Sequence, residues 1–182
     1  MSLIIEDGKG RGHKLAINSD NHAEVIADTQ RIGAAVSERD AETYVWTSAY
    51  SATNGDEVMY IKNTSSTKRL FIDVVRNGSV LNTLFEVFNA TGTSTQAGTT
   101  STGQNLNLRS GNTPESSSMG NAAVTQVTLG NRLGSIRVPA FSQEAMDFGD
   151  ELILNQNDSI AISLTSTAAT IINSTVRGYF KL

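Results

Sequence analysis

The feature that most constrains the fold is a succession of short apolar segments, which begins near residue 44 and continues to the end of the chain. Polar stretches rich in Gly, Asn, Asp, Ser and Thr separate these segments, and such residues favour turns. Short strands at this spacing are typical of a sandwich or barrel, and no segment keeps the 3.6-residue apolar period of a helix. The segments are TYVWTSAY, EVMYIKN, RLFIDVV, TLFEVFN, QNLNL, AVTQVTLG, GSIRVPAF, ELILN, SIAISL and ATIINSTVRGYF. We therefore expect an all-β sandwich domain over residues 44–182.

Alternation of apolar and polar residues predicts which side chains enter the core, because successive side chains of a strand point to opposite faces. The stretch GNRLG, at 130–134, is expected to be the turn between two strands. The residues expected on inward faces are Ile160, Ile162 and Leu164 in SIAISL, Leu70, Ile72 and Val74 in RLFIDVV, and Val176 and Phe180 in the last segment.

Residues 1–43 have a different character and are expected to form an N-terminal arm. The pieces LIIE, KLAIN and AEVIA resemble short strands separated by the turn compositions DGKGRG and NSDN, and residues 28–43 fit a short helix or an extended linker. The arm has too few apolar residues for its own core, yet too many for a solvated tail, so it should dock on a partner surface. The positive side chains would face an acidic surface. The residues expected at this protein interface are Leu3, Ile5, Lys9, Arg11, Lys14, Ile17 and Val25.

Composition argues against several classes of partner. The formal net charge is −4, so no overall positive field attracts nucleic acid. The chain contains no cysteine, which rules out disulfides and thiolate metal sites. No apolar run reaches the roughly 18 residues of a membrane span, and the first residues show no signal-peptide core. Residues 91–103 contain eight Ser or Thr, so they are expected to form an exposed loop.

Candidates for catalysis and metal binding are few, and we expect neither an enzyme nor a cofactor. The only two histidines, His13 and His22, lie in the arm, and there is no G-x-S-x-G motif. A two-histidine metal site in the arm remains an alternative. Asp73 and Glu86 could form the carboxylate pair of a glycosidase, although both occupy positions that fit solvent-facing strand residues. TNGDE, at 53–57, and NQNDS, at 155–159, carry oxygen ligands but lack the spacing of a calcium loop, so they fit turns better.

Both ends of the chain resemble parts of tailed-bacteriophage virion structural proteins. The opening IIEDGKGRGHKLAINSDNHAEVIADTQ is similar to a D-G-x-G-x-G start and the segment that follows it in those proteins. The closing LILNQNDSIAISLTSTAATIINSTVRGYF looks like the last strands of jelly-roll modules that decorate capsids or sit on tails. The resemblance implies a jelly-roll-like β-sandwich with an extended N-terminal arm, a homotrimer, and a place in the virion after assembly in the host cytoplasm.

The expected function is therefore that of a capsid decoration or cement protein, whose partners are the major capsid protein and copies of itself. The alternative is a tail, neck or fibre accessory protein that binds a host receptor or glycan. In that case Tyr44, Trp46 and Tyr50, together with the 91–103 loop, would form the contact surface.

Overall fold

A computed structural model describes residues 5–6, 14–17, 23–25, 42–91 and 100–182 of the chain. The chain forms two compact units, Met1–Arg31 and Ile32–Leu182. The first unit holds a three-stranded antiparallel sheet in the order β1-β2-β3. Its strands are β1 (Ile5–Glu6), β2 (Lys14–Ile17) and β3 (Ala23–Val25). Of the expected helix or linker at 28–43, residues 28–41 lie outside the described part of the chain.

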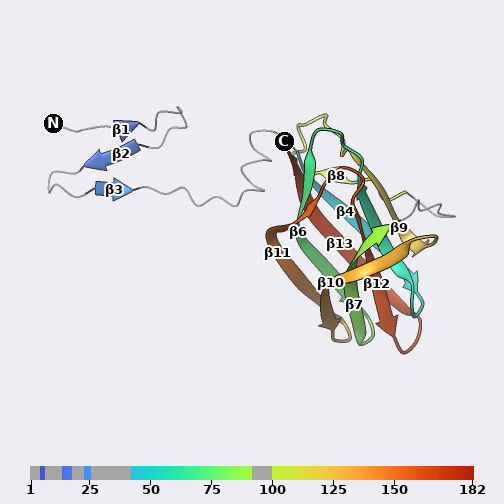
Figure 1. The fold of residues 1–182 in the computed structure, drawn as a ribbon. Coiled ribbons are helices and arrows are strands. Elements are labelled where there is room, and N and C mark those ends of the chain that lie inside the picture. The colour runs from blue at the N-terminus through green and yellow to red at the C-terminus, as the bar shows by residue number, and fades with distance from the viewer. Residues whose placement is uncertain (1–4, 7–13, 18–22, 26–41, 92–99) are drawn as a thin grey trace. The chain divides into compact units, whose positions relative to one another are not determined.

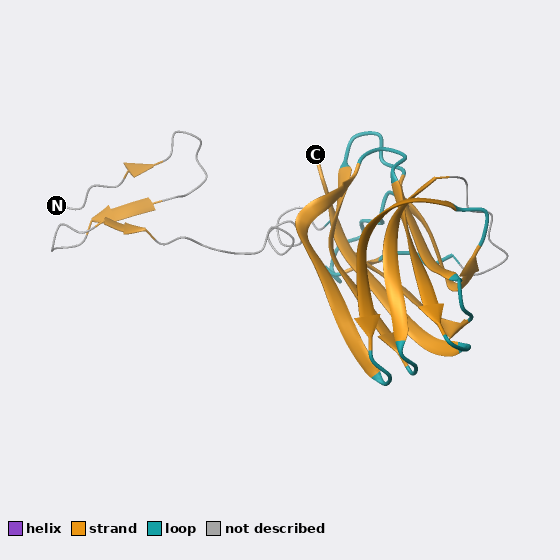
Figure 2. Ribbon diagram, turned by 60° about the horizontal axis from the view of Figure 1, so that its bottom comes forward, coloured by secondary structure: helices purple, strands orange, loops and turns teal. Residues whose placement is uncertain are grey.

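The second unit consists of two five-stranded antiparallel sheets that pack face to face (Figures 1 and 2). The β13 sheet has the order β11-β6-β13-β4-β8, and the β12 sheet has the order β10-β7-β12-β5-β9. The strands of the β13 sheet are β4 (Thr43–Ala52), β6 (Arg69–Ser79), β8 (Gln104–Asn105), β11 (Ser142–Leu154) and β13 (Thr170–Lys181). The strands of the β12 sheet are β5 (Glu57–Asn63), β7 (Thr83–Thr91), β9 (Ser116–Val124), β10 (Thr128–Val138) and β12 (Ser159–Ser166). The described residues contain no helix, as the sequence predicts.

The strand pairing gives the topology of a jelly roll. β7 pairs with β10, β6 with β11, β5 with β12 and β4 with β13, each time antiparallel. The chain thus behaves as one long hairpin that is rolled so that successive pairs fall alternately in the two sheets. Two four-stranded sheets connected in this way define the jelly roll, and β8 and β9 extend them at one side. The predicted jelly-roll sandwich is confirmed.

The core lies between the two sheets and is built from alternate residues of nearly every long strand. Its largest fully buried side chains include Trp46, Tyr44 and Phe85. The expected inward residues of SIAISL and of the last segment all belong to this cluster.

In RLFIDVV, the expectation for Val74 is wrong, since Val75 and not Val74 belongs to the core cluster. The register between β6 and β13 shifts between Ile72 and Val74, where a β-bulge exchanges the two faces of the strand.

The segment between residues 116 and 138 also differs from expectation. The stretch GNRLG is no turn but a bulged part of the continuous strand β10, which shifts register twice against β7. The predicted strand AVTQVTLG is broken instead, because Gln126 adopts a positive φ of 63° between β9 and β10. A second, smaller apolar cluster lies on the outer face of the β12 sheet, and Met119 of β9 and Val127 of the break pack against this cluster, which includes Tyr60.

Candidate functional site

The predicted interface residues of the arm fall partly within the small three-stranded sheet. Ile5 lies in β1, Lys14 and Ile17 lie in β2, and Val25 lies in β3. Ile5 pairs with Leu15, which pairs with Val25, so these residues form one row across the three strands. Lys14 stands opposite Glu6. The remaining interface candidates, which lie outside the described residues, are Leu3, Lys9 and Arg11.

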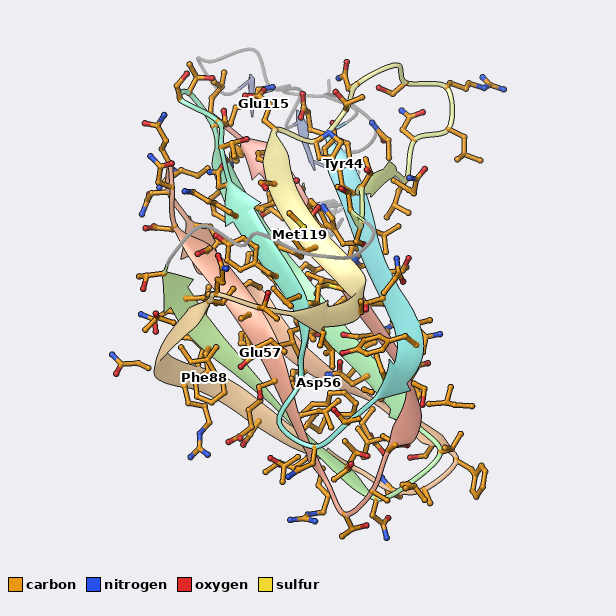
Figure 3. All side chains as sticks on the ribbon, turned by 90° about the vertical axis from the view of Figure 1, so that its right-hand side faces the viewer. Tyr44, Asp56, Glu57, Phe88, Glu115 and Met119 are labelled. Atoms are coloured by element: carbon orange, nitrogen blue, oxygen red, sulfur yellow. The ribbon has the colours of Figure 1, made fainter. Side chains whose placement is uncertain are left out.

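The point at which the chain enters the jelly roll is fixed by an ionic cluster. Lys68 Nζ lies 2.9 Å from a carboxylate oxygen of Glu42 and 2.8 Å from one of Glu115. The backbone N–H of Phe180 donates a hydrogen bond of 3.0 Å to the carbonyl of Glu42, and the Tyr44 hydroxyl donates to its carboxylate. Figure 3 shows Tyr44 and Glu115 at the same end of the sandwich. The residue before β4 is therefore anchored from three sides.

The same surroundings shift the pKa values of Lys68, Glu115 and Tyr44. Hydrogen bonds to Glu115 and Glu42 raise the pKa of Lys68. The pKa of Glu115 is lowered, mainly by the hydrogen bond with Lys68 and then by one with Ser65. Burial, followed by the nearby charge of Glu42, raises the pKa of Tyr44 to about 12. At this junction, the shifts of Lys68 and Glu115 both favour the ion pair between these two side chains.

The two strand carboxylates considered for catalysis are both neutralised by arginines. Asp73 on β6 makes an ion pair with Arg177 of β13, and Glu86 on β7 makes one with Arg132 of β10, at 2.6 Å. β6 and β7 belong to different sheets. Each carboxylate therefore has a structural partner within its own sheet.

The two candidate calcium sequences form turns, as their spacing predicts. The Asp56 carboxylate accepts hydrogen bonds from the backbone N–H and the hydroxyl of Thr53, both at 2.8 Å. The Asp158 carboxylate accepts from the backbone N–H of Asn155 at 2.9 Å and from its side-chain amide at 3.0 Å. Within the described stretches, no group of three or more His, Asp or Glu is placed to hold a metal ion. His13 and His22 lie outside those stretches.

Two of the three aromatic residues expected at the contact surface of the alternative function do not lie at a surface. Tyr44 and Trp46 are fully buried in the core, because their positions on β4 face the opposite sheet. Tyr50 packs against the core and its hydroxyl donates a hydrogen bond to Asp56. Residues 92–99 of the Ser/Thr-rich loop lie outside the described residues.

Four turns lie together at an end of the sandwich that the sequence did not indicate as a site. The pairing of Ala52 with Thr170, and of Ser79 with Ser142, brings the β4–β5, β6–β7, β10–β11 and β12–β13 turns together at the end opposite to the junction. The buried hydroxyl of Ser79 is hydrogen-bonded to those of Thr83 at 2.8 Å and Thr170 at 2.9 Å. The first bond closes the β6–β7 turn, and the second joins this turn to the β12–β13 turn.

Phe141 stands at the tip of this end and is 85% exposed. Its backbone φ is +58°, a conformation that bulky residues rarely adopt. Three hydrogen bonds hold the turn: the N–H groups of Phe141, Ala140 and Ser142 donate to Ser79, Asn82 and Pro139, respectively. The sequence predicts that this residue ends the strand GSIRVPAF, and nothing in the local pattern indicates that its backbone adopts a positive φ.

The chain was compared with models of protein families, with curated proteins and with solved structures, and none of them matches it. In the described part of the chain, no helix has the length and apolar character needed to cross a membrane.

Proposed function

We propose that this protein is a structural component of a bacteriophage virion that decorates and stabilises the capsid surface. The observation that carries the proposal is the combination of a jelly roll with a separate N-terminal unit of three very short strands. The resemblance of both chain ends to phage virion proteins supports the same conclusion. The ion-paired carboxylates and the turn-forming acidic loops are consistent with a function that resides in surfaces.

In this proposal the arm is the attachment device. β1, β2 and β3 have two to four residues each, and sheets of this size are marginal in water. An added strand from a neighbouring capsid protein would supply backbone hydrogen bonds along β1 or β3, the outer strands of the small sheet. Because a capsid repeats the same surface many times, modest contacts at each copy combine into firm attachment when the copies are linked to each other.

Self-association is the second part of the proposal, with a trimer as the expected form. β10 and β11 are the outermost strands of their sheets and are joined by the Pro139–Phe141 turn. Apolar side chains along these two strands are only partly covered, a pattern that fits contact with another copy. They are Leu133, Ile136, Met146, Phe148 and Leu152.

The experiment that tests the proposal is quantitative mass spectrometry of purified virions separated into capsids and tails. We expect the protein in the capsid fraction at a high and fixed ratio to the major capsid protein. Recovery in the tail fraction alone would instead favour the tail, neck or fibre accessory role, which the exposed Phe141 at the end far from the junction also fits. Absence from both fractions would overturn the virion assignment.

A further inference from the structure

A shallow hollow lies on the outer face of the β13 sheet, at the end opposite to the junction. It has a volume of about 440 Å³ and is open to solvent. The three neighbouring strands β11, β6 and β13 form it, and they can be followed side by side in Figure 1. Its main features are Gly78 on β6, Gln143 on β11, and Ile171 and Asn173 on β13, with Phe141 at its edge.

The floor of the hollow is a row of three residues in register. Gln143 pairs with Gly78, and Gly78 pairs with Asn173. Two exposed amide side chains therefore flank a position that has no side chain. The central residue of the row is a glycine and adds no side chain to the hollow.

Neither the backbone nor the packing requires a glycine at position 78. Its φ lies outside the left-handed region, and a Cβ atom placed there would lie 3.4 Å from the Ser142 carbonyl oxygen and 3.7 Å from Gln143 Cβ, which are ordinary contacts. Glycine weakens a strand interior, and where it occurs it often marks a close approach by a ligand or another backbone. What Gly78 provides is the open floor.

The wall of the hollow toward the end of the sandwich is apolar and exposed. Phe141 is 85% exposed and Ile171 is 62% exposed. The strained backbone of Phe141 persists because the hydrogen-bonded turn imposes it, and such strain concentrates at functional sites. Two independent features, an unforced glycine and a strained exposed phenylalanine, thus meet at one place.

The chemistry of the lining selects the class of ligand. None of the described residues that line the hollow is charged. The amides of Gln143 and Asn173 can both donate and accept hydrogen bonds, as sugar hydroxyls require. The face of the Phe141 ring carries partial negative charge and attracts polarised C–H groups, such as those on the apolar face of a pyranose. The closest charged position on this face is Arg76, one row further along β6.

We infer that this hollow binds a neutral sugar unit of an oligosaccharide. The sugar ring lies on the Phe141 side chain, its hydroxyls meet Gln143 and Asn173, and its edge fills the space above Gly78. This inference goes beyond the proposed structural role and does not depend on it, because the site lies within the jelly roll itself.

The test uses the full-length protein on an array of neutral hexose and N-acetylhexosamine oligosaccharides, with sialylated oligosaccharides as acidic probes. We expect binding to at least one neutral glycan, confirmed by saturation-transfer NMR. Phe141→Gly and Gly78→Ala should each weaken that binding at least tenfold, while their melting temperatures stay equal to or above that of the parent. Leu108→Ala removes an exposed side chain outside the hollow and should leave binding unchanged.

Failure to bind any neutral glycan, binding to sialylated probes alone, or undiminished binding by both hollow variants would overturn the inference. The isolated protein is sufficient for each of these measurements. A negative result would therefore leave the virion proposal to be decided by fractionation of the particle.

Discussion

Glu57, at the start of β5, is a carboxylate whose surroundings oppose its charge. Burial raises its pKa most, a backbone hydrogen bond lowers it, and the neighbouring Asp56 raises it again. A carboxyl group with a raised folded-state pKa binds its proton more tightly in the folded than in the unfolded state. Ionised Glu57 therefore destabilises the fold at neutral pH, and the penalty disappears once the pH falls below the ordinary carboxyl pKa of 4.5.

We predict that Glu57→Gln raises the melting temperature at pH 7 by about 2 °C, since a neutral amide avoids the desolvation of the charge. Scanning calorimetry at pH 7 and pH 3.5 measures the change, and the difference from the parent should vanish at the lower pH. Glu144→Gln, at an exposed position on β11, is the control and should have no effect at either pH. A Glu57→Gln variant less stable than the parent at pH 7 would show that ionised Glu57 does not destabilise the fold.

Ile162 offers the most direct test of the core at the scale of one residue. It is 1% exposed and belongs to the central cluster, so Ile162→Asp would place an uncompensated carboxylate between the sheets. We expect a loss of at least about 4 kcal/mol of stability, which is enough to unfold a marginal domain. Urea denaturation followed by tryptophan fluorescence would report it through buried Trp46.

The control for this change should come from the outer face of the same strand. Ser163 is unsuitable, because it stands between Glu57 and Glu86 in the neighbouring strands and an aspartate there would meet two carboxylates. Thr165 is exposed, and Thr165→Asp should keep nearly the full stability of the parent. Equal stability of the Ile162→Asp and Thr165→Asp variants would show that the strand register is wrong.

At the scale of the elements, the sequence predicts regular strands but not the bulges and breaks within them. SIAISL alternates without a break, and its inward residues were predicted correctly. The bulge in β6 was not predictable, because its cause is the register with β13, a partner about 100 residues away in the chain. The stretch GNRLG has the composition of a turn, yet the pairing of β10 with β7 keeps it in a strand.

Among the candidate sites, too, those formed by sequence neighbours could be predicted, and those formed by residues far apart in the chain could not. Both acidic turns could be recognised from their Asn, Asp and Gly residues, which act over three or four positions. The hollow could not be recognised, because Gly78, Gln143 and Asn173 meet only through the order of the strands in the sheet. The ionic junction likewise joins residues from three separate parts of the chain.

The ionic cluster of Glu42, Lys68 and Glu115 also permits a prediction about stability. Lys68→Ala would leave Glu42 and Glu115 near each other without their shared cation. All three side chains are partly exposed, so we expect a loss of only about 1 kcal/mol at pH 7 and low salt. Thermal unfolding measures it, and Lys62→Ala on β5 is a control for the loss of a lysine.

The pH dependence of that loss follows from the lowered pKa of Glu115. A depressed carboxyl pKa contributes stability above the ordinary value of 4.5, and the contribution is lost as the pH falls through the folded-state value. The difference between Lys68→Ala and the parent should therefore shrink below pH 4.5. A difference that is constant from pH 7 to pH 3 would show that the ion pairs contribute nothing.

For the whole molecule, the proposal predicts a homotrimer at micromolar concentration. The partly covered apolar side chains of β10 and β11 would then lie between subunits. Leu133→Asp, at a position that is 40% exposed, should give monomers that keep the β-rich circular dichroism spectrum of the parent. Sedimentation equilibrium that shows a monomer for the unaltered protein would remove the trimer and leave the jelly roll intact.

We propose that the protein acts through its surfaces as a virion component attached by its arm. The most direct measurement is cosedimentation of the full-length protein, and of the Ile32–Leu182 unit alone, with virus particles that lack the protein. The shorter chain keeps the Glu42 junction, so it should melt near the parent temperature. We predict that the full-length protein sediments with the particles and that the Ile32–Leu182 unit stays largely in the supernatant. Equal binding of the two would contradict attachment by the arm, and the absence of binding by the full-length protein would contradict the virion assignment itself.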